Sequence, residues 1–137
     1  MSRGHSILVV DDDGATRTVV KTALRRAGHY ATSASGQDEV TALLKRLKFD
    51  LVITDVFMPE FDGIEVIKAV KEHQPEAAIV AMSGGGGSFR TAEVCLTLAR
   101  AAGSSAALAK PFHLEELFQA MGKALGSRAT HLKTLTA

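Results

Sequence analysis

The chain has 137 residues, of which 46% are apolar and 23% charged, as expected for one globular domain that buries its own core. Sixteen basic and fifteen acidic side chains give a formal net charge of +1, so overall charge gives no reason to expect binding to nucleic acid or to an acidic membrane. The single cysteine, Cys95, excludes an internal disulfide and a zinc site built from several cysteines. No apolar run approaches the ~20 residues that span a bilayer, and the first residues lack the features of a signal peptide, so we expect a soluble, cytoplasmic domain.

Short apolar runs alternate with longer amphipathic stretches, and this alternation predicts the elements of the fold. In chain order we expect strand 7–10, helix 16–27, strand 30–34, helix 40–47, strand 51–54, helix 64–70, strand 78–82, helix 89–102, strand 105–109 and helix 114–125. Continuous apolar runs suit strands covered on both faces, whereas the small and polar strand 30–34 suits a sheet edge. Repeated strand–helix units predict a parallel α/β sheet with helices on both faces.

Polar residues follow the predicted strands at the ends where active groups of parallel sheets gather. These residues are Asp11, Asp12 and Asp13 after the first strand, Asp55 after strand 51–54, Ser83 after strand 78–82 and Lys110 after the last strand. Close carboxylates repel unless a cation or proton intervenes, and oxygen ligands favour a hard ion such as Mg²⁺. Such an ion and a lysine also neutralise a transferring phosphoryl group, for which a carboxylate can act as nucleophile. Singly, each residue is more often structural, and Asp13 has helix capping as its alternative.

Four short segments carry the most specific pattern of the sequence. They are ILVVDDD at 7–13, DLVITDVFMP at 50–59 with Asp62-Gly63 after it, AMSG at 81–84 and LAKPF at 108–112. In this order they resemble the receiver (CheY-like) domain of two-component response regulators. The resemblance covers residues 5–125 and implies a flavodoxin-like (βα)5 fold, a doubly wound parallel sheet of strand order 2-1-3-4-5 in a three-layer sandwich. Residues 126–137 are then a short C-terminal tail, and no output domain is expected.

The same resemblance assigns roles at the metal and phosphoacceptor site. It implies that Asp55 takes up the phosphoryl group. Asp11 and Asp12 would hold Mg²⁺, Asp12 directly and Asp11 through water, with Asp55 and the backbone carbonyl of Phe57 completing the protein ligands.

Two further residues receive roles from the resemblance. Ser83 would be the switch hydroxyl that bonds the phosphoryl oxygen, and Lys110 would pair with Asp55 and then with the phosphoryl group. The peptide bond between Lys110 and Pro111 is expected to be cis, as is typical of the family.

The sequence departs from the family pattern at three places. Ala107 stands where the family usually has an aromatic switch residue, three positions before Lys110. A methyl group cannot swing between buried and exposed rotamers, so the output surface would respond through backbone and loop motion instead. The glycine run at 84–87 lengthens the segment before the last strand, as a mobile gate or as a tolerated insertion. Phe57 places a bulky side chain beside the site, and it is either a restriction on access or a neutral surface residue.

Two classes of function fit these observations. The first is a stand-alone receiver that takes a phosphoryl group from a sensor histidine kinase or a histidine phosphotransfer protein and switches a surface that binds an unknown downstream protein. It would not be an enzyme beyond its own phosphorylation and dephosphorylation, and the absence of a DNA-binding helix pair after residue 125 argues against direct DNA binding. The second is a Mg²⁺-dependent phosphatase or phosphotransferase that acts on small molecules through an aspartate nucleophile. Holding phosphate on the glycine run at 84–87 is a weaker third alternative, since the run fits no nucleotide-binding fingerprint.

Overall fold

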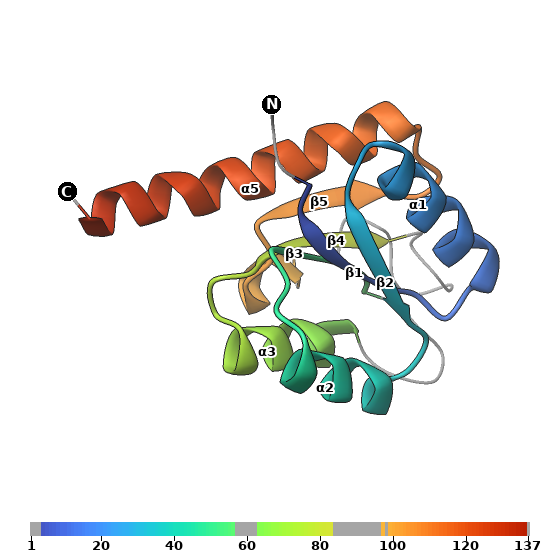
Figure 1. The fold of residues 1–137 in the computed structure, drawn as a ribbon, viewed down its shortest axis with the longest axis horizontal. Helices are drawn as coiled ribbons and strands as arrows, with labels where there is room; N and C mark the ends of the chain where they lie inside the picture. Colours follow the sequence, from blue (N-terminus) through green and yellow to red (C-terminus); the bar gives the residue numbers. More distant parts are fainter. Residues whose placement is uncertain (1–3, 57–62, 84–96, 98, 137) are drawn as a thin grey trace.

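The computed structural model describes residues 4–56, 63–83, 97 and 99–136, with side chains as far as residue 126 (Figure 1). Its elements are β1 (Ser6–Val10), α1 (Gly14–Arg26), β2 (Tyr30–Ala34), α2 (Gln37–Arg46), β3 (Leu51–Asp55), α3 (Gly63–His73), β4 (Ala78–Ser83), β5 (Ala106–Ala109) and α5 (Leu114–Thr136). Residues 97 and 99–102, from the predicted helix 89–102, are also helical. Phe57, Asp62 and the glycine run at 84–87 lie outside the described residues, so the predictions for them stay untested.

The sheet has the predicted order β2-β1-β3-β4-β5, and every neighbouring pair is parallel. The register aligns the carboxyl ends of the strands, because Val10 pairs with Thr54, Asp55 with Met82 and Ser83 with Ala109. The residues that end or follow these strands therefore reach one edge of the sheet.

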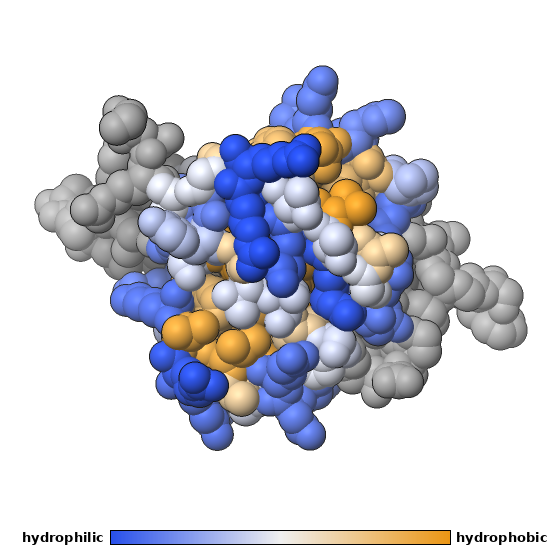
Figure 2. All heavy atoms as spheres, turned by 45° about the vertical axis from the view of Figure 1, so that its right-hand side comes forward, coloured by the Kyte–Doolittle hydropathy of each residue, from blue (hydrophilic) through white to orange (hydrophobic). Residues whose placement is uncertain are grey.

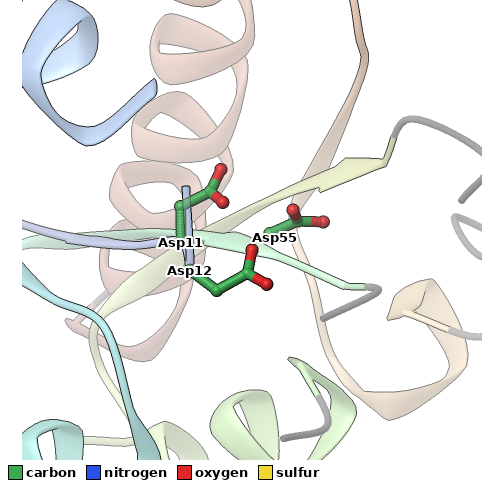
Figure 3. Close-up of side chains that lie close together, drawn as sticks. All are labelled: Asp11, Asp12 and Asp55. Atoms are coloured by element: carbon green, nitrogen blue, oxygen red, sulfur yellow. The ribbon is translucent and has the colours of Figure 1, made fainter. Parts of the chain in front are cut away.

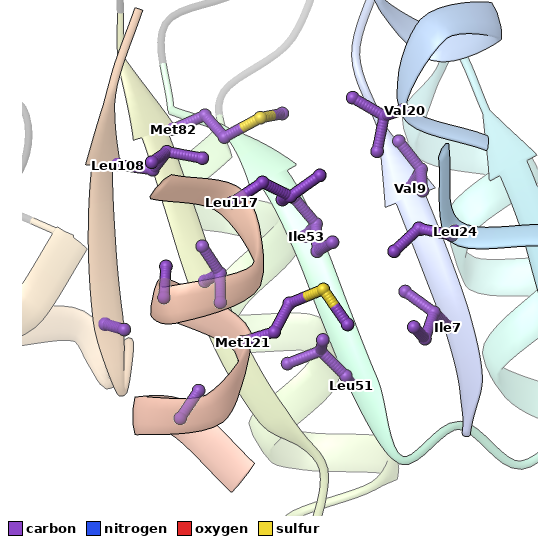
Figure 4. Packing of buried hydrophobic residues seen from close by; sticks show 14 of the residues in the cluster. Ile7, Val9, Val20, Leu24, Leu51, Ile53, Met82, Leu108, Leu117 and Met121 are labelled. Carbon is purple, nitrogen blue, oxygen red and sulfur yellow. The ribbon is translucent and has the colours of Figure 1, made fainter. Parts of the chain in front are cut away.

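Two helix layers cover the sheet, with α1 and α5 on one face and α2 and α3 on the other (Figure 1). Alternating residues of β1 serve both layers, since Ile7 and Val9 pack with α1 and α5 whereas Leu8 and Val10 pack with α2 and α3. Figure 4 shows the apolar core between the sheet and the layer of α1 and α5. In it, Leu117 and Met121 of α5 lie over the central strands. Burial on both faces explains why these strands are continuously apolar in sequence.

The helix ends agree with the glycine positions. Gly28 and Gly103 have positive φ angles of 94° and 124°, a backbone conformation that favours glycine just beyond a helix, and each ends the helix predicted before it.

The last helix is longer than the sequence predicted. α5 runs from Leu114 to Thr136 and continues beyond the body of the sheet, where we expected a tail at 126–137 (Figure 1). No proline follows Leu114, and the glycine at 126 lowers helix stability by only about 1 kcal/mol relative to alanine. Among the described residues, no helix combines the length and the apolar character required to cross a lipid bilayer.

Candidate functional site

Three carboxylates converge at the carboxyl edge of the sheet (Figure 3). Asp11 follows β1 directly, Asp12 comes next, and Asp55 is the last residue of β3. One oxygen from each of the three lies within 4.8 Å of the others. Asp11 and Asp55 are buried, whereas Asp12 is exposed, so the cluster opens to solvent on the side of Asp12.

The backbone between β1 and α1 holds Asp11 in a fixed position. Its amide donates to the carbonyl of Ala34 at 3.3 Å, and its Oδ1 accepts from the amide of Asp13 at 3.0 Å. The guanidinium of Arg17 donates from Nη1 to the backbone carbonyl of Asp11 at 2.6 Å. Sequence reasoning missed Arg17, whose only signal is that it follows the acidic run in the first turns of a predicted helix.

Asp13 caps helix α1. Its Oδ1 accepts from the amide of Ala15 at 3.2 Å, and its Oδ2 accepts from the hydroxyl of Thr16 at 2.7 Å. These hydrogen bonds to the ionised carboxylate lower the pKa of Asp13. The capping alternative is thus confirmed, and Asp13 lies outside the carboxylate cluster of the described residues.

Lys110 joins two of the three carboxylates. Its Nζ donates to Oδ2 of Asp11 at 2.7 Å and to Oδ2 of Asp55 at 2.9 Å, and 22% of its side chain is exposed. Burial by itself would lower the pKa of Lys110, but the hydrogen bonds and charges of Asp11 and Asp55 outweigh it and raise the pKa. The bond between Lys110 and Pro111 is cis, as expected.

Ser83 lies at the same edge as the last residue of β4, fully buried. Its carbonyl accepts from the amide of Lys110 at 2.9 Å, which ties the end of β5 to the end of β4. Ala107 lies on β5 opposite Ala81 and is partly buried. The five predicted side chains at 11, 12, 55, 83 and 110 therefore all reach this edge, while Phe57 is outside the described residues.

A glycine brings the start of α3 against the end of β3. The amide of Gly63 donates to the carbonyl of Val56 at 3.2 Å, and a Cβ at this position would overlap the backbone oxygen of Asp55. The sequence showed Asp62-Gly63 as part of the motif that follows residues 50–59, but it gave no sign of this close approach. The start of α3 therefore packs directly against the backbone of Asp55 and Val56.

The charge balance of the cluster favours a divalent cation. Partial burial is the largest of the causes that raise the pKa of Asp12, and a hydrogen bond with Asp11 and the negative charge of Asp11 raise it further. Lys110 forms ion pairs with Asp11 and Asp55, whereas within the part of the chain that the structure describes no ion pair reaches Asp12. Carboxylate oxygens this close together, one of them open to solvent, are a donor set that Mg²⁺ or Ca²⁺ prefers.

Comparison with known proteins decides the family. A sequence profile of the response regulator receiver domain matches residues 7–122. The chain belongs to this receiver domain family. Its fold and the order of its motifs are as the sequence predicted.

The receiver is similar both to short proteins and to parts of long ones. It is 32% identical over 121 residues to the chemotaxis protein CheY of Thermotoga maritima, covering 88% of this chain and 97% of that protein. It is 36% identical over 124 residues to the DNA-binding transcriptional regulator NtrC of Azospirillum brasilense, covering 89% of this chain but only 24% of that protein. The chain thus spans about a quarter of the length of its NtrC relatives.

A solved response regulator of Burkholderia pseudomallei is similar to the receiver, with a TM-score of 0.75 and 25% sequence identity. The match covers 96% of this chain and 72% of the Burkholderia chain. That structure contains a phosphorylated aspartic acid and a calcium ion. The receiver domain is thus a phosphoacceptor module of two-component signalling, and the alternative of a small-molecule phosphatase is not favoured.

Proposed function

We propose that Asp55 is the phosphoacceptor of this receiver and that Mg²⁺ is its metal ion. The observation that carries the proposal is the placement of Lys110, whose ammonium bonds both Asp55 and Asp11 inside the carboxylate cluster. A phosphoryl group arriving at Asp55 adds negative charge to a site that is already acidic. A fixed ammonium at 2.9 Å from the accepting carboxylate is the compensation that such a transfer needs.

The metal would be held by Asp11, Asp12 and Asp55, together with the backbone carbonyl of Phe57 as the family pattern implies. When bound, Mg²⁺ supplies positive charge that neutralises the phosphoryl oxygens during transfer. Asp12 is the most accessible of these carboxylates and is suited to direct contact, whereas Asp11 is already occupied by Lys110 and the amide of Asp13.

The transfer itself is a displacement at phosphorus. A carboxylate oxygen of Asp55 forms a bond to the phosphorus of a phosphohistidine, the bond from phosphorus to imidazole nitrogen breaks, and the imidazole leaves with that electron pair. Lys110 then keeps its contact with Asp11 and pairs with the new phosphoryl group, and Ser83 donates its hydroxyl to a phosphoryl oxygen. Hydrolysis of the acyl phosphate by water returns the carboxylate.

An exposed apolar groove supports docking of a phosphodonor protein next to this site. Val19 of α1 is 58% exposed, and Leu114 and Phe118 of α5 are 45% and 36% exposed. Two adjoining hollows share Val19 and Leu114, and one of them reaches Lys110. Figure 2 shows apolar side chains exposed among hydrophilic ones on the side of the molecule that carries α1. The donor would be a sensor histidine kinase or a histidine phosphotransfer protein.

We propose that the receiver turns over no substrate other than its own phosphoryl group, acts in the cytoplasm and transmits its state to a downstream protein. DNA binding is a property of the NtrC relatives and is not proposed for these 137 residues. With Ala107 on β5, transmission relies on movement of the backbone rather than on rotation of an aromatic ring.

Intact-mass spectrometry after incubation with acetyl phosphate tests the proposal. Wild type should gain one phosphoryl group only when Mg²⁺ is present, and Asp55→Asn should gain none. Asp13→Asn is the matched control, because it removes a neighbouring carboxylate that caps α1 outside the cluster, and it should still be phosphorylated. An adduct on Asp55→Asn, or equal yields without Mg²⁺, would refute the assignment.

A further inference from the structure

Arg17 connects helix α1 back to the acidic loop. It lies near the start of α1 (Gly14–Arg26), is half-buried, and donates from Nη1 to the backbone carbonyl of Asp11 at 2.6 Å. The guanidinium also lies over the first residue of the helix, since a Cβ on Gly14 would be 3.4 Å from its Nη2. One hydrogen bond from a charged guanidinium therefore joins the two ends of the segment 11–17.

The carbonyl that Arg17 holds belongs to the peptide bond between Asp11 and Asp12. Because a peptide is planar, fixing the direction of its carbonyl fixes the plane that ends at the Cα of Asp12. Asp11 has further restraints, in the contacts of its carboxylate with Lys110 and with the amide of Asp13. Asp12 is exposed, and apart from its contact with the side chain of Asp11 the position of its carboxylate depends on this peptide.

We propose that Arg17 is a positioning residue of the divalent-metal site, which holds the peptide between Asp11 and Asp12 so that both carboxylates face the same point. The inference rests on the Mg²⁺ site proposed above. Groups that orient metal ligands without touching the ion hold those ligands in place before the ion binds, so that less conformational entropy is lost on binding. Removing such groups typically lowers metal affinity by about 10- to 100-fold.

The sign of the effect separates positioning from simple charge. Arg17 is a cation near an acidic cluster, and by charge alone its removal would make the cluster more negative and tighten Mg²⁺ binding. By positioning, its removal releases the peptide and weakens Mg²⁺ binding. The two roles therefore predict opposite changes in the same measured quantity.

Isothermal titration with Mg²⁺ on the full chain provides the test, alongside the melting temperature of the metal-free protein. Arg17→Ala should bind Mg²⁺ about tenfold more weakly than wild type. Arg17→Lys, which keeps a donor, should recover part of the loss. Arg25→Ala is the matched control, because Arg25 lies on the same helix and makes a similar bond from Nη2 to the carbonyl of Ala31 at 2.9 Å, away from the cluster. It should bind as wild type does.

The outcomes are distinguishable. Unchanged or tighter Mg²⁺ binding by Arg17→Ala overturns the positioning role, as does an equal loss in Arg25→Ala, which would indicate a general effect of helix α1. Absence of Mg²⁺ binding by wild type overturns the proposed metal and this inference with it. Should Arg17→Ala fail to fold, Arg17→Gln is measured in its place and the same two results decide.

Discussion

Replacing Lys110 by methionine should separate metal binding from phosphoryl transfer. The change keeps a long apolar stem and removes the ammonium that bonds Asp11 at 2.7 Å and Asp55 at 2.9 Å. The Oδ2 atoms of Asp11 and Asp55 then lose their ammonium partner and become available as metal ligands. The same ammonium is the charge aimed at the incoming phosphoryl group, so the two effects have opposite signs.

The sizes of the two effects can be estimated from Coulomb's law and from the usual effect of removing one hydrogen-bond donor. Two unit charges 4 Å apart interact by about 1 kcal/mol even at the dielectric constant of water, and against a divalent ion the energy doubles, so loss of the ammonium should tighten Mg²⁺ binding by about tenfold or more. Removing one donor aimed at charge that develops in a transition state lowers the rate by about 10²- to 10³-fold. Lys110→Met should therefore bind Mg²⁺ more tightly yet accept phosphate far more slowly.

Titration calorimetry gives the affinity, and a time course of intact mass with acetyl phosphate at saturating Mg²⁺ gives the rate. Lys68→Met is the control, because Lys68 pairs with Glu65 at 3.5 Å on the exposed face of α3 and its replacement should change neither quantity. Weaker Mg²⁺ binding by Lys110→Met, or phosphorylation at the wild-type rate, would refute this account of the lysine.

Three other predictions concern stability. Gly63→Ala should lower the free energy of unfolding by about 1–3 kcal/mol, because the new Cβ would overlap the backbone at the end of β3. Gly122→Ala should instead stabilise α5, because no atom lies within 4 Å of the new Cβ. Urea unfolding of both variants measures these changes. Gln74→Leu should destabilise by about 1–3 kcal/mol, since its amide accepts one backbone bond and donates two at the end of α2; an unchanged unfolding midpoint would contradict it. Without metal, Asp12→Asn should be more stable than wild type at neutral pH, because partial burial and Asp11 raise the pKa of Asp12 above its unfolded value of 3.8. The difference in the free energy of unfolding between the two proteins should shrink as the pH falls through that raised pKa. A difference in the free energy of unfolding that does not change with pH would contradict this prediction.

Much of the fold and of the site follows from local sequence. The apolar runs of β1, β3 and β4 are continuous because both faces are covered, and that burial is visible in composition alone. Strands of this kind are parallel, so residues at their carboxyl ends meet at one edge, and this places Asp11, Asp55 and Ser83 together before any coordinates are known. Glycines mark helix ends for an equally local reason, as Gly28 does after α1.

Other features depend on how distant segments meet. The two halves of the Lys110–Asp11 contact are 99 residues apart, and sequence suggested only the pairing with Asp55. Asp12 belongs to the carboxylate cluster, whereas its neighbour Asp13 caps helix α1. This difference in role depends on the direction that the backbone takes between β1 and α1. The bond from Arg17 to the Asp11 carbonyl depends on a rotamer that no periodicity encodes.

Local pattern reports how each residue is buried, because burial selects residue type one position at a time. The sequence by itself therefore determined the layers, the strand ends and the chemical types gathered there. Tertiary structure decided which of those groups touch, because hydrogen bonds and ion pairs depend on distances of a few tenths of an ångström between segments far apart in the chain.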